Sequence, residues 1–233
     1  MEDSERDLRE VVATGCRVLG ENGHDDFIWG HASVRDPSGR GAWLKAAGIG
    51  LTEVTPSNVH LVDRSGELIE GDGSLHVEYP IHLEIMAAHP RVGAVVHSHP
   101  PYSIALGASG VDLLPVSHPG TLFAAGLSRF DETGDLIVTA DLGQRLAQAL
   151  GDADAMLMVN HGIVTVGTDL PSAVVRAIVL EHACRHQLLT SSFGGKMQWS
   201  SPEEAQAKLA RIWPDPQIAL VWDYLVRQLS NTP

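Results

Sequence analysis

Two short apolar runs in this chain each end in histidine. Residues 92–96 lead into His97 and His99, and residues 155–159 lead to His161. Apolar runs of this length, followed by turn residues, are typical of buried β-strands. Side chains two residues apart in a strand project to the same side, so His97 and His99 can direct two imidazoles at one point. The chain is therefore expected to form a sheet whose strand ends open into polar loops.

These three histidines favour a metal site. Three neutral imidazoles from two strand ends suit a zinc-type ion with one coordination position open. Taken singly, each signal is weaker, because a His-x-His pair is also found at polar strand ends and a lone turn histidine is usually hydrogen-bonded. Glu78 stands just before Pro80, at the start of a predicted helix. It is an acid stabilised by the helix N-terminus with no other role, or a fourth metal ligand, or an acid–base group that exchanges on and off the metal.

Helical periodicity and turn residues divide the chain into helices and strands. The predicted helices cover 5–22, 80–89, 102–107, 141–150, 171–189, 202–212 and 217–229. The predicted strands cover 27–36 with a turn at Gly30, 41–45, 58–63, 66–69, 92–96, 136–138, 155–159 and 163–166. Asp141 is the expected N-cap of its helix. The sequence therefore predicts an α/β fold, a single three-layer α/β/α domain over residues 1–233 with a mainly antiparallel central sheet.

Composition limits the partners. The chain carries 29 acidic and 16 basic residues, a formal charge of −13, which argues against nucleic acid or an anionic membrane as the main partner. No apolar run approaches the ~20 residues of a membrane span, and the acidic N-terminus lacks the features of a signal peptide. Cys16 and Cys184 form no CxxC pattern. We expect reduced thiols in a cytoplasmic protein that acts on a small molecule.

Four segments of the chain resemble the class II aldolase/adducin family. They are GHASVR at 30–35, AAGIGLTEVTPSNVHLVD at 46–63, the run HPRVGAVVHSHP that follows Glu78, and VNHGIVTVG. Members of this family include L-fuculose-phosphate aldolase, L-ribulose-phosphate 4-epimerase and methylthioribulose-phosphate dehydratase. The resemblance implies that His97, His99 and His161 hold one divalent ion per subunit, Zn²⁺ or alternatively Mn²⁺. It also implies that Glu78 is the catalytic acid–base group, and that the protein is a homotetramer with active sites at subunit interfaces.

The chain departs from the sugar-phosphate members of the family at three places. Gly30-His31 stands where they carry Gly-Asn, Ala47-Gly48 where they carry Ser/Thr-Gly, and His76-Val77 where they carry Ser-Ser. Each change removes an amide or hydroxyl that would hydrogen-bond a phosphate. The replacements His31 and His76, with Lys45 and Arg35, are groups that pair with carboxylates. The pattern resembles the decarboxylase branch of the family, whose members act on hydroxylated aromatic or pyridine dicarboxylates.

Residues and resemblance together predict a metal-dependent lyase that decarboxylates a hydroxylated aromatic or heteroaromatic carboxylate or dicarboxylate. Glu78 or His76 would protonate the ring carbon. The expected contacts of the anionic substrate are His31, Arg35, Lys45, Gly48 and, from the C-terminal helix of a neighbouring subunit, Tyr224. One alternative is an aldolase, epimerase or dehydratase acting on a sugar or sugar phosphate. Another is a non-catalytic interaction protein like the head domain of adducin, against which the intact set of metal-ligating residues counts.

Overall fold

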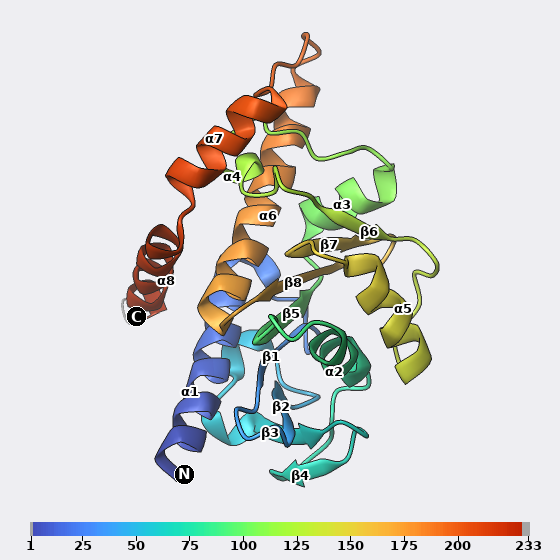
Figure 1. Ribbon diagram of the computed structural model, residues 1–233, viewed down its shortest axis with the longest axis vertical. Coiled ribbons are helices and arrows are strands. Elements are labelled where there is room, and N and C mark those ends of the chain that lie inside the picture. The colour runs from blue at the N-terminus through green and yellow to red at the C-terminus, as the bar shows by residue number, and fades with distance from the viewer. Residues whose placement is uncertain (1, 230–233) are drawn as a thin grey trace.

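An eight-stranded sheet runs through the computed structural model, which describes residues 2–229. Its strand order is β4-β3-β2-β1-β5-β8-β7-β6 (Figure 1). The strands are β1 His31–Arg35, β2 Gly41–Lys45, β3 Val59–Asp63, β4 Leu68–Glu70, β5 Ala94–Ser98, β6 Ser128–Phe130, β7 Ala155–Met158 and β8 Ile163–Gly167. Every neighbouring pair is antiparallel except β6 with β7. The mainly antiparallel sheet predicted from the sequence is confirmed.

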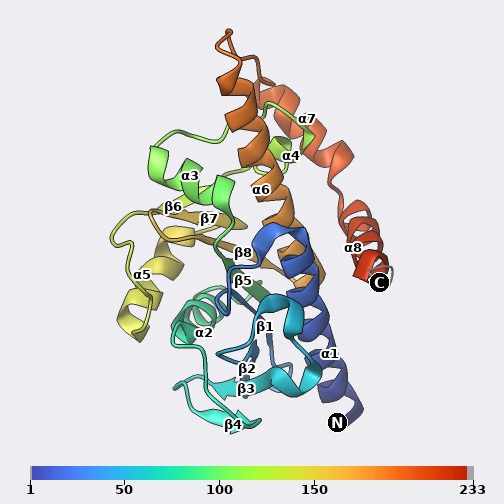
Figure 2. The same ribbon diagram turned by 180° about the vertical axis from the view of Figure 1, so that it is seen from behind.

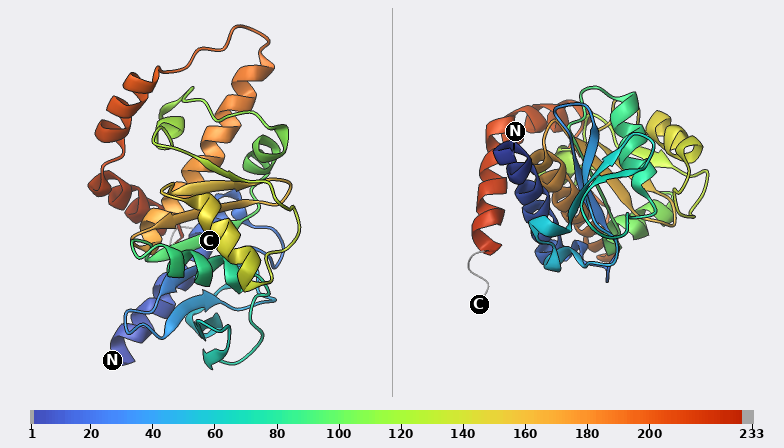
Figure 3. Two further views of the ribbon diagram at one scale, coloured as in Figure 1. Left: turned by 45° about the vertical axis from the view of Figure 1, so that its right-hand side comes forward. Right: turned by 90° about the horizontal axis from the view of Figure 1, so that it is seen from below.

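Helices cover both faces of the sheet, as predicted. α1 Glu2–Leu19 and α6 Leu170–Ser192 lie on one face, and α2 Tyr79–Ala88 and α5 Ala140–Leu150 lie on the other (Figure 1 and Figure 2). The remaining helices are α3 Pro101–Ser109, α4 His118–Thr121, α7 Pro202–Ile212 and α8 Asp215–Leu229, with short turns of helix at Gly20–His24, Leu51–Glu53 and Pro56–Asn58. The C-terminal helices α7 and α8 form an outer layer beyond α6 (Figure 3). Within residues 2–229, no helix is both long and apolar enough to cross a membrane.

The alternation of side chains along each strand divides the core between the two faces of the sheet. On β5, Ala94 and Val96 pack in the apolar cluster that includes residues of α1 and α6. Val95 packs in the second cluster, with residues of α2 and α5. His97 continues the alternation and projects to the same side as Val95. The strand period therefore places His97 between the sheet and α2. Glu78 immediately precedes the first residue of α2.

Residues 136–138 form no strand, although the sequence predicted one there. Ile137 is buried, and its N–H donates to a carboxylate oxygen of Glu78 at 2.9 Å. This apolar run therefore satisfies its backbone through a side chain instead of a neighbouring strand. The sheet ends in β6 at Ser128–Phe130, which pairs with β7 in parallel. A strand of three residues is too short to show a periodic pattern in the sequence.

Several elements begin at residues other than those predicted, and two of these differences have a clear local cause. The N-cap of α5 is Thr139, whose hydroxyl accepts a backbone N–H in the first turn, and Asp141 lies inside that turn. The strand predicted over 27–36 is shorter and begins only with β1. Phe27 and Gly30 both have positive φ values, 52° and 73°, and such residues cannot continue an extended strand. The resulting turn carries residues that face the candidate site.

Candidate active site

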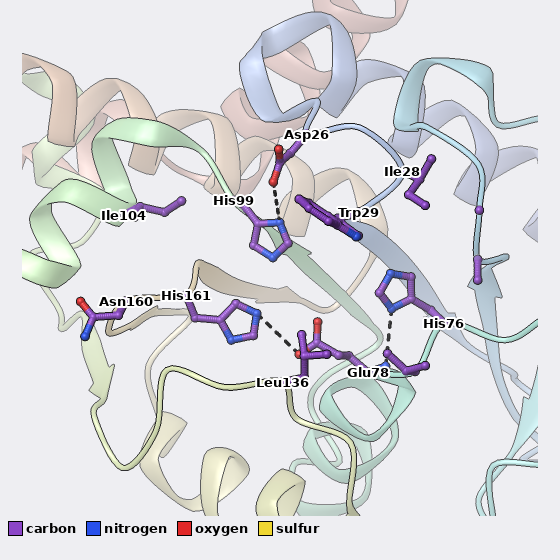
Figure 4. A pocket seen from close by; sticks show the side chains of 13 residues that line it. Asp26, Ile28, Trp29, His76, Glu78, His99, Ile104, Leu136, Asn160 and His161 are labelled. Atoms are coloured by element: carbon purple, nitrogen blue, oxygen red, sulfur yellow. Dashed lines mark hydrogen bonds and ion pairs between the residues drawn. The ribbon is translucent and has the colours of Figure 1, made fainter.

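Three histidines and one glutamate meet where β5 ends and β8 begins. His97 lies within β5, His99 just after it, and His161 in the turn between β7 and β8. Glu78 is the residue immediately before α2. One nitrogen of each imidazole and one carboxylate oxygen all lie within 4.8 Å of one another. The structure brings together the four residues that the sequence suggested as a metal site, and Figure 4 shows His99, His161 and Glu78 from close by.

The turn between β7 and β8 is shaped to present His161. Asn160 has a left-handed backbone with φ of 59°, which asparagine adopts more readily than most other residues. Gly162 allows the turn to pack against the other ligands. A Cβ at this position would lie 2.5 Å from the Ser98 carbonyl oxygen and 2.7 Å from the ring of His99. Only glycine fits, so the sequence Asn-His-Gly is required locally to bring the third imidazole into the cluster.

Two of the rings have their second nitrogen occupied by an acceptor. His97 Nδ1–H donates to the Ile163 carbonyl at 2.9 Å, and His99 Nδ1–H donates to Asp26 Oδ2 at 3.1 Å. Because a carbonyl and a carboxylate only accept, the neutral rings carry their lone pairs on Nε2. These two Nε2 atoms lie 3.0 Å apart. Two lone pairs at that distance repel each other unless a metal ion or a proton lies between them, and outer hydrogen bonds of this kind are typical of metal-bound histidines.

The Glu78 carboxylate lies between His97 and His161. Its Oε2 lies 3.6 Å from His97 Nε2, and its Oε1 lies 3.6 Å from His161 Nε2. Both separations exceed ordinary hydrogen-bond lengths, yet they allow the groups to face one ion. Although burial acts to raise it, the pKa of the Glu78 carboxyl lies below its ordinary value, because His161 and the Ile137 N–H stabilise the charged form. The carboxylate therefore supplies the negative charge that a divalent ion needs.

Burial favours the neutral form of two imidazoles of this cluster, those of His97 and His99. The pKa of His97 lies well below its ordinary value because the ring is fully buried and because His99 and His161 oppose a further positive charge. Burial also lowers the pKa of His99, against the opposing effect of Asp26. Protonated rings would be the other way to resolve the facing lone pairs, and desolvation disfavours them. Since neutral imidazole is the metal-binding form, the four residues fit a divalent metal.

A cavity of about 460 Å³ opens beside His99, His161 and Glu78 (Figure 4). Its apolar lining consists of Ile28, Trp29, Ala47, Val77, Ile104 and Leu136. Its polar lining consists of three imidazoles, two carboxylates and the Asn160 amide. Among the described residues, no lysine, arginine, serine or threonine lines this space. The cavity therefore suits a flat apolar ring beside the metal site, and it offers a phosphate few donor side chains.

The structure places the predicted substrate contacts at different depths. His76 and Gly48 line the cavity. His31 lies directly behind His76, with ring centroids 3.8 Å apart, and is fully buried. Lys45 is also buried, and its Nζ donates to two backbone carbonyls, each at 3.2 Å. Both residues are thus close to the site, but neither lines the cavity.

Arg35 and Tyr224 do not line the cavity either. The Arg35 guanidinium donates to the carbonyl oxygens of Met86, His89 and Val92. It therefore ties the C-terminal end of α2 to the sheet and is not free to bind a substrate at the cavity. Tyr224 lies on α8 and is 52% exposed. A contribution from Tyr224 would have to be made to the site of another copy of the chain.

Three residues around the site were not predicted from the sequence: Asp26, Trp29 and His82. Asp26 and Trp29 belong to the segment around the predicted first strand, whereas the structure places them in the turn above the cavity. His82 is buried on α2, where a single histidine looks like any core position. A metal-binding histidine usually donates its second ring N–H to an acceptor, so an acid near His99 could be expected. The sequence alone does not tell which acid is near.

Comparison with known proteins adds an independent finding. Residues 10–188 match the family model of the class II aldolase and adducin N-terminal domain. The chain is 30% identical to the 3,4-dihydroxyphthalate decarboxylase of Arthrobacter keyseri over 237 residues, which covers 95% of this chain and 94% of that protein. It is 32% identical to decarboxylase NovR of Streptomyces niveus over 204 residues, 86% of this chain and 73% of that protein. The L-fuculose 1-phosphate aldolase structure from Glaciozyma antarctica PI12 matches with a TM-score of 0.87 at 26% identity, covering 99% of this chain and 91% of that chain.

Proposed function

The chain belongs to the class II aldolase and adducin family, and from this premise we propose that it is a metal-dependent carbon–carbon lyase. The proposed reaction is decarboxylation of a hydroxylated aromatic or heteroaromatic carboxylate or dicarboxylate. The observation that carries the proposal is the lining of the cavity. Four candidate metal ligands open into a largely apolar space in which, among the described residues, no lysine, arginine, serine or threonine lines the wall. A sugar phosphate would find little to bind there, whereas an aromatic acid would find apolar surface.

The apolar wall has two roles in the proposed reaction. Ile28, Trp29 and Leu136 give a flat ring a surface to pack against. Once a neighbouring subunit covers them, they would also exclude water, which strengthens electrostatic interactions at the reacting carbon. The carboxyl and hydroxyl groups of the substrate face the polar end of the cavity, which includes His99 and Glu78. This orientation places the bond to be broken beside the metal ligands.

A divalent ion held by His97, His99 and His161 would supply a Lewis acid that stabilises negative charge on the substrate. The Glu78 carboxylate is suited to accept the proton of the ring hydroxyl. When the carbon–carbon bond breaks, carbon dioxide leaves and the electron pair stays on the ring carbon. The proton held on Glu78 then passes to that carbon. His76 lines the same cavity and is the alternative proton donor for this last step.

We further propose one divalent ion per subunit, zinc in preference to manganese, because imidazole nitrogens suit zinc. We also propose a homotetramer with active sites at subunit interfaces. Ile28, Trp29 and Val77 support this assembly, since they line the cavity and yet are 46%, 50% and 57% exposed. Apolar groups left open in this way are typical of surfaces that a partner covers. The free, buried Cys16 and Cys184 support a reducing compartment, for which we propose the cytoplasm.

The second candidate function is an aldolase that cleaves a sugar or sugar phosphate. Its support is the close fold match to an L-fuculose 1-phosphate aldolase. Aldol cleavage and decarboxylation both leave an electron pair on a carbon that neighbours an oxygen-bearing carbon, and a metal on that oxygen would serve both reactions. The same four ligands therefore fit either reaction, and the residues of the cavity decide between them.

One substrate screen tests the proposal. Metal-loaded protein is supplied with hydroxylated aromatic and pyridine mono- and dicarboxylates, and separately with fuculose and ribulose phosphates. Carbon dioxide and aldehyde release are both measured. We expect carbon dioxide from at least one aromatic acid and no efficient cleavage of the sugar phosphates. Efficient sugar-phosphate cleavage without release of carbon dioxide from any acid would replace the decarboxylase proposal with the aldolase.

A further inference from the structure

A chain of three hydrogen-bonded side chains lies behind the cavity. The Ser33 hydroxyl is 2.6 Å from His82 Nδ1, and His82 Nε2 is 2.5 Å from His31 Nδ1. Ser33 and His31 come from β1 and His82 comes from α2, and all three residues are fully buried. The remaining ring nitrogen, His31 Nε2, is buried and has no hydrogen-bond partner. A polar atom buried without a partner is costly unless a ligand completes it.

The position of His31 shows where that ligand would lie. Its ring centroid is 3.8 Å from that of His76, which lines the cavity, and 5.0 Å from that of His97. One ring nitrogen of His31, one of His76 and a carboxylate oxygen of Glu78 lie within 4.8 Å of one another. Since His31 Nδ1 is taken by His82, the nitrogen left for the site is Nε2.

The hydrogen bonds of this chain have a preferred direction. A neutral imidazole has one N–H and one lone pair, and burial lowers the pKa of His82 to about 3, so the ring is neutral. Ser33 Oγ has no other hydrogen-bond partner within residues 2–229, so its hydrogen is satisfied only by donation to His82 Nδ1. His82 then donates from Nε2 to His31 Nδ1. This order leaves the proton of His31 on Nε2, whereas the reverse order leaves a buried hydroxyl hydrogen unpaired.

We propose that Ser33 and His82 are positioning residues that fix His31, which lies behind His76 at the inner wall of the cavity, as an N–H donor toward the site. The ligand class that suits this donor is an anionic oxygen, and on the proposed function, on which this part rests, it is the carboxylate of the substrate. The donor is neutral, so it orients the carboxylate without a full charge. It would hold that group while the ring packs against the apolar wall. Neither Ser33 nor His82 lines the cavity, so both act only through His31.

The direction of the hydrogen bonds from Ser33 through His82 to His31 can be measured without any substrate. Long-range ¹H–¹⁵N spectra of zinc-loaded, histidine-labelled protein distinguish the two tautomers of a neutral imidazole. We expect His31 to carry its proton on Nε2 in the wild type, to populate both tautomers in Ser33→Ala, and to regain one in Ser33→Thr, which keeps the hydroxyl. Ser117→Ala is the matched control, because it removes an exposed serine–histidine contact to His186 and should leave the His31 signals unchanged.

Activity provides the second test. We expect Ser33→Ala to bind zinc as the wild type does but to lose about ten- to a hundredfold in kcat/KM, with Ser33→Thr restoring most of it. The inference is overturned if wild-type His31 carries its proton on Nδ1, or if Ser33→Ala leaves its tautomer unchanged. The wild-type spectrum decides even if a variant fails to fold. If no acid is decarboxylated while the tautomer depends on Ser33, the proposed reaction fails and the positioning role is supported.

Discussion

His97 Nε2 and His99 Nε2 lie 3.0 Å apart, and the opposite nitrogen of each ring is held by an acceptor. The backbone carbonyl of Ile163 holds the first ring, and the carboxylate of Asp26 holds the second. The two acceptors thus fix His97 and His99 with their Nε2 lone pairs directed toward each other. We therefore expect metal affinity to depend on residues that never touch the metal. Asp26, in the turn that precedes β1, is the side chain with that role.

Asp26→Ala should weaken metal binding while leaving all four candidate ligands in place. His99 loses the acceptor on Nδ1, so its ring is free to rotate and to adopt the other tautomer. We expect zinc affinity to fall by about ten- to a hundredfold, as is usual when such a partner is removed. Competition with a chelator of known affinity measures the change. Asp152→Ala, which removes an exposed acid outside the cavity, is the control, and an equal loss in both variants would contradict this account.

Gly162→Ala should displace the metal ligands through a steric effect. The added methyl would lie 2.5 Å from the Ser98 carbonyl and 2.7 Å from the His99 ring, so the turn or the ring must move. We expect zinc affinity to fall by about tenfold or more, because ligand geometry must be held closely. Gly195→Ala is the matched control, since a methyl group added there would meet nothing within 4 Å. Unchanged affinity in Gly162→Ala would show that the described turn does not govern the site.

Asp36→Asn should reduce stability in a pH-dependent way. The buried carboxylate accepts hydrogen bonds from the Arg40 and Trp43 side chains. The Arg40 hydrogen bond in particular lowers the pKa of Asp36 below its ordinary value of 3.8. The carboxylate therefore contributes its full stability above pH 3.8, the value expected in the unfolded chain, and loses it as pH falls through the lower folded pKa.

The free energy of unfolding of Asp36→Asn, measured with urea, should be about 2 kcal/mol below that of the wild type at pH 7, since hydrogen bonds to a charged group are lost. The gap should narrow only below about pH 4. Asp152→Asn, at an exposed position, should show little difference at either pH. A difference in the free energy of unfolding that grows as the pH falls would contradict the stabilising role of the Asp36 carboxylate.

The assembly is tested by the mass in solution. Sedimentation equilibrium at assay concentration should give four times the 25.0 kDa of one chain. If Tyr224 reaches a neighbouring site, Tyr224→Ala should keep that mass and zinc content but lower kcat/KM. Leu220→Ala, at a neighbouring exposed position on α8, is the control for a change on this helix. A fully active monomer would refute the interface proposal.

Much of the fold could be predicted because sheet and helix periods are visible in the sequence. The strands of the centre are apolar on both sides, as Ala94, Val95 and Val96 show by packing into both cores. The strand prediction failed where an apolar residue is buried but its backbone pairs with no other strand. Ile137 is buried without a strand partner, because Glu78 accepts its N–H. A contact between residues so far apart in the chain leaves no local pattern.

The candidate site was predictable in its ligands but not in its surroundings. His97, His99 and His161 stand at strand ends, and strand geometry alone can bring them together. Arg35 shows the limit of reasoning from residue type: its guanidinium suits a carboxylate, but the end of α2 occupies it. His82 shows the converse, because a histidine on a buried helix face looks like core until its neighbours on β1 are known.

A metal titration of the metal-free protein tests the central claim most directly. Zinc is added in fractions of one equivalent per chain, and carbon dioxide release from the best aromatic acid of the screen is followed. We expect release to be absent at first, to rise in proportion to zinc, and to level off at one equivalent. His97→Ala should show no rise. Full release of carbon dioxide by protein verified to be metal-free would contradict the account of a metal-dependent lyase.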